Sequence, residues 1–94
     1  MRPVELSPHA ERDLERLVDF LAAKSERAAL AAADAIVMAV QSLGELSDRG
    51  RRVGRSGHRR ELFVRYGRDG YVIRYRVTAE SILITRIFHG RERR

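Results

Sequence analysis

The hydrophobic pattern of this chain changes once, near residue 60, from the spacing of helices to the spacing of strands. In the first half, four apolar residues fall at the i, i+3, i+4, i+7 positions of one helical face: Leu14, Leu17, Val18 and Leu21. After residue 60, apolar residues recur at every second position, as they do along half-buried strands. Helices followed by strands are typical of a single α+β domain, which we predict for residues 1–94.

The first half carries the signals of one strand and two helices. Pro3 to Leu6 alternates weakly, which predicts a short strand at a sheet edge, where proline is tolerated. Ser7, followed by proline, predicts a helix start, and Ser25 can cap a second helix. The predicted apolar stripe of the second helix comprises Leu30, Ala33, Ile36, Val37, Val40 and Leu43. The short break between the helices predicts an antiparallel hairpin.

The second half predicts a loop and then a three-stranded antiparallel meander. Residues 48–60 contain three glycines and six arginines, so we predict a loop there. Strands are predicted over 62–66 and 71–77, joined by a turn at 67–70 that contains two glycines. The last strand, 82–88, is mostly apolar, as expected for the middle of a sheet.

Charge is distributed unevenly along the chain, which has a formal net charge of +6. Residues 1–48 carry five basic and nine acidic side chains, whereas residues 49–94 carry fourteen arginines and four carboxylates. A half this basic is expected to bind an anionic partner, either nucleic acid or an acidic protein.

Several function classes find little support in the residue types. The chain has no cysteine, no apolar run long enough to span a bilayer and no signal-peptide layout, so we expect a cytoplasmic protein. No serine lies between glycines as in a nucleophile elbow, and the three histidines, His9, His58 and His89, are scattered. We therefore predict no catalytic residue, no metal site and no cofactor.

Arginines near the C-terminus form the strongest candidate binding site. Arg74 and Arg76 lie two residues apart, so on a strand they project from the same face. Guanidinium groups bind phosphate and carboxylate through a two-pronged fork. The candidate target-binding residues are Arg74, Arg76, Arg86, His89, Arg91, Arg93 and Arg94. The alternative interpretation is a solvated outer sheet face whose arginines are balanced by carboxylates from the helices.

The segment GYVIRYRVTAESILITRIFHGRERR resembles the C-terminal third of toxins of the RelE/ParE superfamily. In these toxins a strand rich in tyrosine and arginine precedes a strand that ends in His-Gly-Arg. The order of the elements also agrees along essentially the whole chain, and residues 60–91 carry the specific part of the resemblance. The resemblance implies the toxin of a type II toxin–antitoxin system.

The superfamily contains two function classes. Members of the RelE branch are ribosome-dependent mRNA endonucleases that use an arginine after the Gly-Tyr of the middle strand and a tyrosine in a C-terminal extension. Here Val72 follows Gly-Tyr, and the sequence ends at Arg94 without such a tyrosine. Members of the ParE branch are not enzymes but poison DNA gyrase, and we expect this second activity. A RelE-like endonuclease, a nucleic-acid-binding module and a retargeted or degenerate toxin are the alternatives.

The resemblance also implies a cognate antitoxin, which usually wraps the toxin by helix-in-groove contact and strand addition. An acidic antitoxin would complement the basic second half. The candidate antitoxin-binding residues are Leu17, Leu21, Val37, Val40, Phe63, Tyr75 and Phe88. The expected partners are this antitoxin and DNA gyrase. We expect no membrane contact, and nucleic acid only indirectly through the antitoxin or the target.

Overall fold

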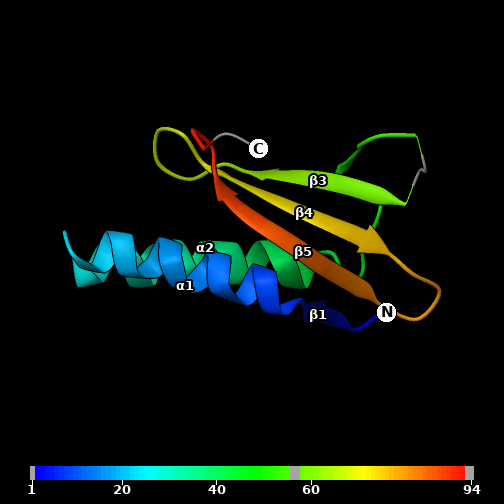
Figure 1. Ribbon diagram of the computed structural model, residues 1–94, viewed down its shortest axis with the longest axis horizontal. Coiled ribbons are helices and arrows are strands. Elements are labelled where there is room, and N and C mark those ends of the chain that lie inside the picture. Colours follow the sequence, from blue (N-terminus) through cyan, green and yellow to red (C-terminus); the bar gives the residue numbers. More distant parts are fainter. Residues whose placement is uncertain (1, 56–57, 93–94) are drawn as a thin grey trace.

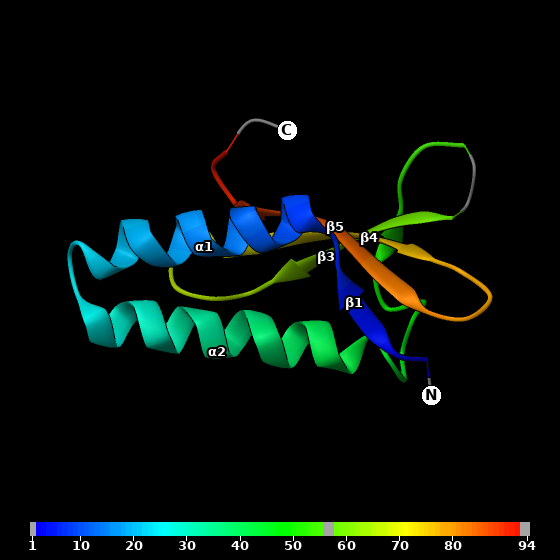
Figure 2. The same ribbon diagram turned by 60° about the horizontal axis from the view of Figure 1, so that its bottom comes forward.

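The computed structural model describes residues 2–55 and 58–92, which form two layers. Helices α1 (Pro8–Ala22) and α2 (Glu26–Ser42) cover one face of a single sheet (Figure 1). The two helices lie side by side and antiparallel, as predicted (Figure 2). Both predicted helix starts are confirmed, because the Ser7 side chain accepts a hydrogen bond from the backbone N–H of Ala10 and the Ser25 side chain accepts one from Ala28.

Five strands form the sheet in the order β1-β5-β4-β3-β2. Their bounds are β1 Val4–Leu6, β2 Arg51–Arg52, β3 Arg59–Val64, β4 Tyr71–Val77 and β5 Ile82–His89. The predicted meander is present as the antiparallel strands β3, β4 and β5. β1 lies at one edge and pairs with β5 in parallel, so the sheet is mixed and β5 lies inside it, as predicted.

The loop predicted over residues 48–60 contains a strand. Arg51 and Arg52 pair with Glu61 and Arg60 of β3, and the backbone N–H of Val53 donates to the carbonyl of Arg59. β3 also begins and ends earlier than predicted, at residues 59 and 64. The arginine-rich sequence gives no strand signal, because these short strands are held by pairing with distant residues rather than by their own alternation.

The buried face of α2 differs from the predicted stripe. Leu30 is 67% exposed and Val37 is exposed as well, so both predictions are wrong. Alanines take their place in the core, where Ala29, Ala32 and Ala39 are buried beside Ile36 and Leu43. Small side chains allow neighbouring elements to approach closely, which leaves the larger apolar residues of α2 on the surface.

A bulge in β5 decides which residues face away from the helices. Arg74 pairs with Arg86, but the next residue, Tyr75, pairs with Ile84, so Thr85 is an extra residue in β5. The hydroxyl of Thr85 donates to the carbonyl of Arg74 at 3.1 Å. Arg86 therefore lies directly opposite Arg74 on the sheet face that the helices do not cover.

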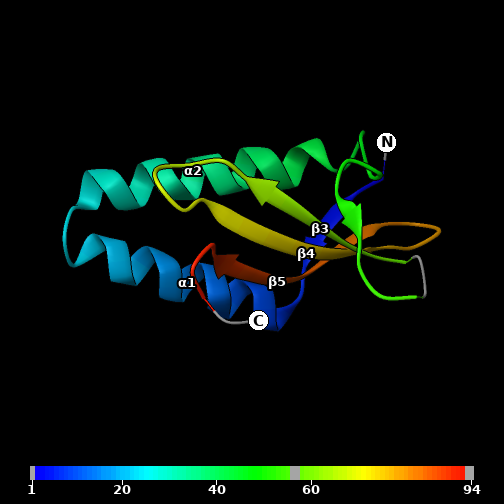
Figure 3. The same cartoon turned by 90° about the horizontal axis from the view of Figure 1, so that it is seen from above.

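Figure 3 shows this uncovered face of the sheet, which we call the outer face. In the described part of the chain, neither helix has the length and apolar character that a membrane-spanning helix requires.

Candidate functional site

Three rows of side chains cross the outer face, as the strand register places them. The apolar row consists of Phe63, Val72 and Phe88. The paired row consists of Arg51, Glu61, Arg74 and Arg86. The open row consists of Arg59 and Arg76. Arg74 and Arg76 share this face, as their spacing predicted.

Glu61 neutralises Arg74 within the paired row. The Nε and Nη2 atoms of Arg74 both donate to Glu61 Oε2, at 3.0 and 2.8 Å. Glu61 is buried, and Arg51 Nη2 lies 3.6 Å from its other oxygen. The guanidinium of Arg74 therefore donates to Glu61 within the protein and is not available for a ligand.

Asp13 neutralises Arg86 from the other layer of the fold. Arg86 Nε donates to Asp13 Oδ2 at 2.8 Å, and Arg86 Nη2 donates to Oδ1 at 3.3 Å. Asp13 belongs to α1 and is 4% exposed. For Arg86 the structure thus matches the alternative interpretation, in which a helix carboxylate balances an arginine of the sheet.

Phe88 lies beneath both of these arginines. The Cζ atoms of Arg86 and Arg74 stand 4.6 and 5.3 Å from its ring centroid. Guanidinium groups at this distance from an aromatic ring are attracted by its π-electrons. The two arginines and the buried ring form one packed unit.

Carboxylates also accept hydrogen bonds from backbone N–H groups of β5 in the part of the strand that β1 does not reach. Asp13 Oδ2 accepts from the backbone N–H of Ile87 at 2.9 Å, and Glu92 Oε1 accepts from the N–H of His89 at 3.1 Å. Arg16 bridges the two carboxylates, at 3.6 Å from Asp13 and 2.9 Å from Glu92. These contacts fasten α1, β5 and the C-terminal segment together.

The charges of this network shift the titration of its members. Burial alone would raise the pKa of Asp13, but hydrogen bonds from Arg86 and Ile87 outweigh it and hold the pKa below its ordinary value. Burial is likewise outweighed at Glu92, whose pKa is lowered by the hydrogen bonds from Arg16 and His89. The hydrogen bond to Glu92 raises the pKa of Arg16.

Gly90 anchors the C-terminal segment to the turn between β3 and β4. Its N–H donates to the carbonyl of Gly70 at 2.9 Å. A Cβ atom on Gly90 would lie only 2.0 Å from the carbonyl oxygen of Asp69, so this position has room for glycine alone. Arg91 Nε donates to the Asp69 carboxylate at 3.1 Å.

The remaining predicted target-binding residues differ in their surroundings. The ring of His89 packs edge-on against Tyr71, with centroids 5.7 Å apart, and is half-buried. Arg91 is exposed apart from its bond to Asp69. Arg93 and Arg94 lie outside the described residues.

Val72 is 6% exposed and packs in the apolar row. Its side chain offers neither charge nor a proton to a substrate. In the segments 2–55 and 58–92, no group of three histidine or acidic side chains is arranged to hold a metal ion.

Four of the seven predicted antitoxin contacts are buried within the domain: Leu17, Val40, Tyr75 and Phe88. Tyr75 is 0% exposed, and its hydroxyl accepts from the N–H of Gly50 and donates to the carbonyl of Ser47, both at 2.8 Å. The packing of the helices on the sheet covers Leu17, Val40 and Tyr75, whereas Phe88 is covered by Arg74 and Arg86 on the outer face. Of these four residues, only Val40 also lines a surface groove. Leu21 is half-buried, and the other two, Val37 and Phe63, are exposed.

An apolar groove runs between the two helices and β1 and has Val37 on its wall. Its volume is about 210 Å³. The lining residues are Val4, Leu6, Leu14, Ile36, Val37, Val40, Gln41 and Ile87. Seven of these eight side chains are aliphatic, so the groove suits an apolar helix face.

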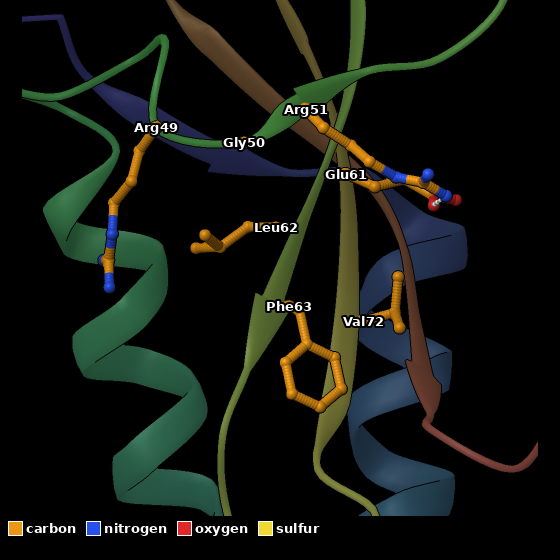
Figure 4. A pocket seen from close by; sticks show the side chains of 7 residues that line it. All are labelled: Arg49, Gly50, Arg51, Glu61, Leu62, Phe63 and Val72. Atoms are coloured by element: carbon orange, nitrogen blue, oxygen red, sulfur yellow. Dashed lines mark ion pairs between the residues drawn. The ribbon is translucent and has the colours of Figure 1, made fainter.

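A second hollow lies beside the start of β2, where the edge of β3 beyond Glu61 is open (Figure 4). β2 pairs with Arg60 and Glu61 only. The hydrogen bond from Val53 to Arg59 shows that the backbone N–H and C=O of Arg59 point towards β2. Because these groups alternate in direction along a strand, those of Glu61 and Phe63 point the same way. Phe63 is 58% exposed at this edge, and none of the described strands pairs with it there.

The fold and its relatives place this chain among the small toxins of type II toxin–antitoxin systems. A solved structure titled "Chromosomal ParDE TA system from P. aeruginosa" superposes with a TM-score of 0.78 at 25% identity, over 95% of this chain and 96% of that one. The chain belongs to the family described as "ParE toxin of type II toxin-antitoxin system, parDE", whose profile matches residues 4–94.

Two relatives come from Caulobacter vibrioides. "Toxin RelE3" is 44% identical over 94 residues and covers 100% of both chains. "Toxin RelE1" is 41% identical over 91 residues, covering 97% of this chain and 96% of its own. A type II toxin has a cognate antitoxin as its partner, so the predicted superfamily and partner class are confirmed.

Proposed function

We propose that this toxin inhibits DNA gyrase in the cytoplasm by binding it directly, without catalysis, and that its antitoxin prevents this. The observation that carries the choice is Val72, at the position where the RNase branch has an arginine. Cleavage of a phosphodiester requires groups that stabilise the developing negative charge and groups that move protons. A buried valine supplies neither.

The neighbouring arginines do not replace the missing charge. Arg74 and Arg86 flank Val72 on the outer face, but their forks are occupied by Glu61 and Asp13. Binding a phosphate with either arginine would require breaking a charge-assisted contact of a buried carboxylate. This arrangement supports a binding protein over a nuclease.

We place the target contact at the C-terminal segment. Arg91 is exposed there, and its backbone is held by the bond from the Gly90 N–H to Gly70 and by its own N–H, which donates to His89 Nδ1. Asp69 orients the Arg91 side chain through its Nε atom. A cation on an ordered segment loses little conformational freedom when it binds. This preorganisation supports Arg91 as a contact for an acidic surface of the target.

We place the antitoxin at the apolar groove and at the open edge of β3. An amphipathic helix would fill the groove beside Val37, and an added strand would pair with the backbone at Phe63. Acidic flanks on this segment would complement the arginines of the second half.

A paired assay tests the target. Purified toxin is added to a gyrase supercoiling reaction and to a translating extract with labelled mRNA. We expect gyrase inhibition that the antitoxin reverses, and intact mRNA. Codon-specific cuts without gyrase inhibition would establish the RelE-like activity instead. This activity is the second candidate, because both Caulobacter relatives are named RelE toxins.

Two matched pairs of variants test the surfaces. Arg91→Ala should raise the toxin concentration needed for half inhibition of gyrase, whereas Arg27→Ala, an exposed arginine of α2, should not. Val37→Asp should weaken antitoxin binding more than Met38→Asp, because Met38 is exposed but does not line the groove. Equal effects within either pair would refute that assignment.

A further inference from the structure

The open row differs from every other arginine pair on the outer face. Arg59 and Arg76 are direct cross-strand partners, and both side chains are exposed. Among the residues that the structure describes, neither forms an ion pair. Like charges directly opposite each other destabilise a sheet.

The backbone shows how close this pair is. The N–H of Val77 donates to the carbonyl of His58, which makes residues 58 and 77 a hydrogen-bonded pair. The next pair, Arg59 and Arg76, is therefore of the non-hydrogen-bonded type, in which the Cα atoms are about 4.5 Å apart and the side chains are closest. The strand pairing therefore places the two arginines side by side on the outer face, and neither forms an ion pair with the described residues.

We propose that Arg59 and Arg76, with Arg51 beside them, bind phosphate groups of a nucleic-acid backbone. Two adjacent guanidinium forks match the oxygens of one phosphate or of consecutive phosphates. The guanidinium of Arg51 is available to join them because its side chain is 78% exposed and touches Glu61 only at 3.6 Å. This site goes beyond the proposed function, since neither gyrase nor antitoxin binding requires it.

The surroundings favour nucleic acid over an acidic protein. Protein interfaces have an apolar centre, and the large exposed apolar residues of the described chain lie elsewhere: Phe20, Leu30, Val37, Met38, Leu46 and Phe63. The open row is flanked by Val53 and Leu83, which are only partly exposed. A charged surface without an apolar centre is suited to salt-sensitive phosphate contacts.

The site is also separate from the C-terminal segment. Arg59 and Arg76 lie at the end of the sheet near the β4–β5 turn, whereas His89 pairs with Tyr71 at the other end. The carboxylate of that turn, Glu80, forms no ion pair with either arginine in the described structure.

Fluorescence anisotropy of the full chain tests the proposal. The probes are a labelled DNA duplex, single-stranded RNA of the same sequence and a polyglutamate peptide of matched charge. The Arg59→Ala/Arg76→Ala variant is compared with Arg65→Ala/Arg68→Ala, which removes the same charge from the β3–β4 end of the molecule.

We expect the Arg59/Arg76 variant to bind nucleic acid about tenfold more weakly at moderate salt, with the slope of log affinity against log salt reduced by about 2 for duplex DNA. Tighter binding of duplex or of RNA identifies the natural source of the phosphates. The thermal midpoint of the Arg59→Ala/Arg76→Ala variant should not fall below that of the wild type, which would show that its fold is intact. Equal losses in both variants, tighter binding of polyglutamate, or no nucleic-acid binding by the wild type would each overturn the proposal.

Discussion

The paired row and the open row present the same residue type in two electrostatic states. Arg74 and Arg86 lie opposite each other, as Arg59 and Arg76 do. The first pair is enclosed by a carboxylate on each side and rests on Phe88, whereas the second has neither. The comparison teaches that an arginine row on a sheet is not by itself a binding site, because neutralisation by distant carboxylates decides whether its charge is available.

The largest effect should follow removal of the carboxylate that serves both Arg86 and the β5 backbone. Asp13→Asn leaves Arg86 without its counter-ion, and we expect a loss of about 3 kcal/mol in the free energy of unfolding. Urea denaturation measures it. Asp34→Asn, at an exposed position of α2, is the control, and a similar small change in both variants would contradict the structural role of Asp13.

Glu61→Gln should release Arg74 and Arg51 from their shared carboxylate, while Arg86 stays paired with Asp13. Loss of the charge-assisted bonds to Arg74 should cost about 2 kcal/mol of stability. The released guanidinium should also strengthen nucleic-acid binding in the anisotropy assay. Glu80→Gln serves as the control, because Glu80 is exposed in the β4–β5 turn. Unchanged stability would mean that Glu61 does not hold the row.

Acid should destabilise the fold by protonating Asp13 and Glu92. The folded-state pKa values of Asp13 and Glu92 lie below their ordinary values of 3.8 and 4.5, so the unfolded chain takes up protons at higher pH than the folded chain. Their contribution is complete above about pH 5 and is lost as the pH falls through the lowered pKa values. Unfolding free energies at stepped pH values should decline less steeply in Asp13→Asn than in the wild type.

The smallest effect should be a gain. Arg59→Glu places a carboxylate opposite Arg76 and should stabilise the sheet by about 0.5 kcal/mol, because an opposite-charge cross-strand pair replaces a like-charge one. The same variant should lose nucleic-acid affinity. Arg65→Glu lies outside the paired strands and should leave stability unchanged, so a loss of stability in Arg59→Glu would contradict our account of the open row.

The helices and the meander were predictable because their signals are local. Ser7 and Ser25 cap within three residues, and the alternation of β4 is visible in its own sequence. The buried face of α2 was not predictable from hydrophobicity, since a run of alanines offers several equivalent faces and the neighbouring layer selects one.

The neutralisation of the arginines was not predictable, because its partners are far apart in sequence. Asp13 and Arg86 are separated by 73 residues, and the Thr85 bulge that aligns Arg86 with Arg74 leaves no mark in the strand pattern. One signal was present: Asp13 falls three residues after Ala10 and four before Leu17, in the middle of the apolar face of α1. A carboxylate at such a position predicts a buried partner.

The two edges of the sheet differ in the unpaired backbone groups that they offer to another chain. On the β5 side, β1 is three residues long and follows Pro3, and beyond it Asp13 and Glu92 occupy backbone donors of β5. On the β3 side, the backbone at Phe63 is open. A second copy of this toxin that paired at the β3 edge would occupy the open edge of both molecules, so that this kind of pairing would stop at two molecules. An antitoxin strand at Phe63 would use the same edge, so its binding would exclude such pairing.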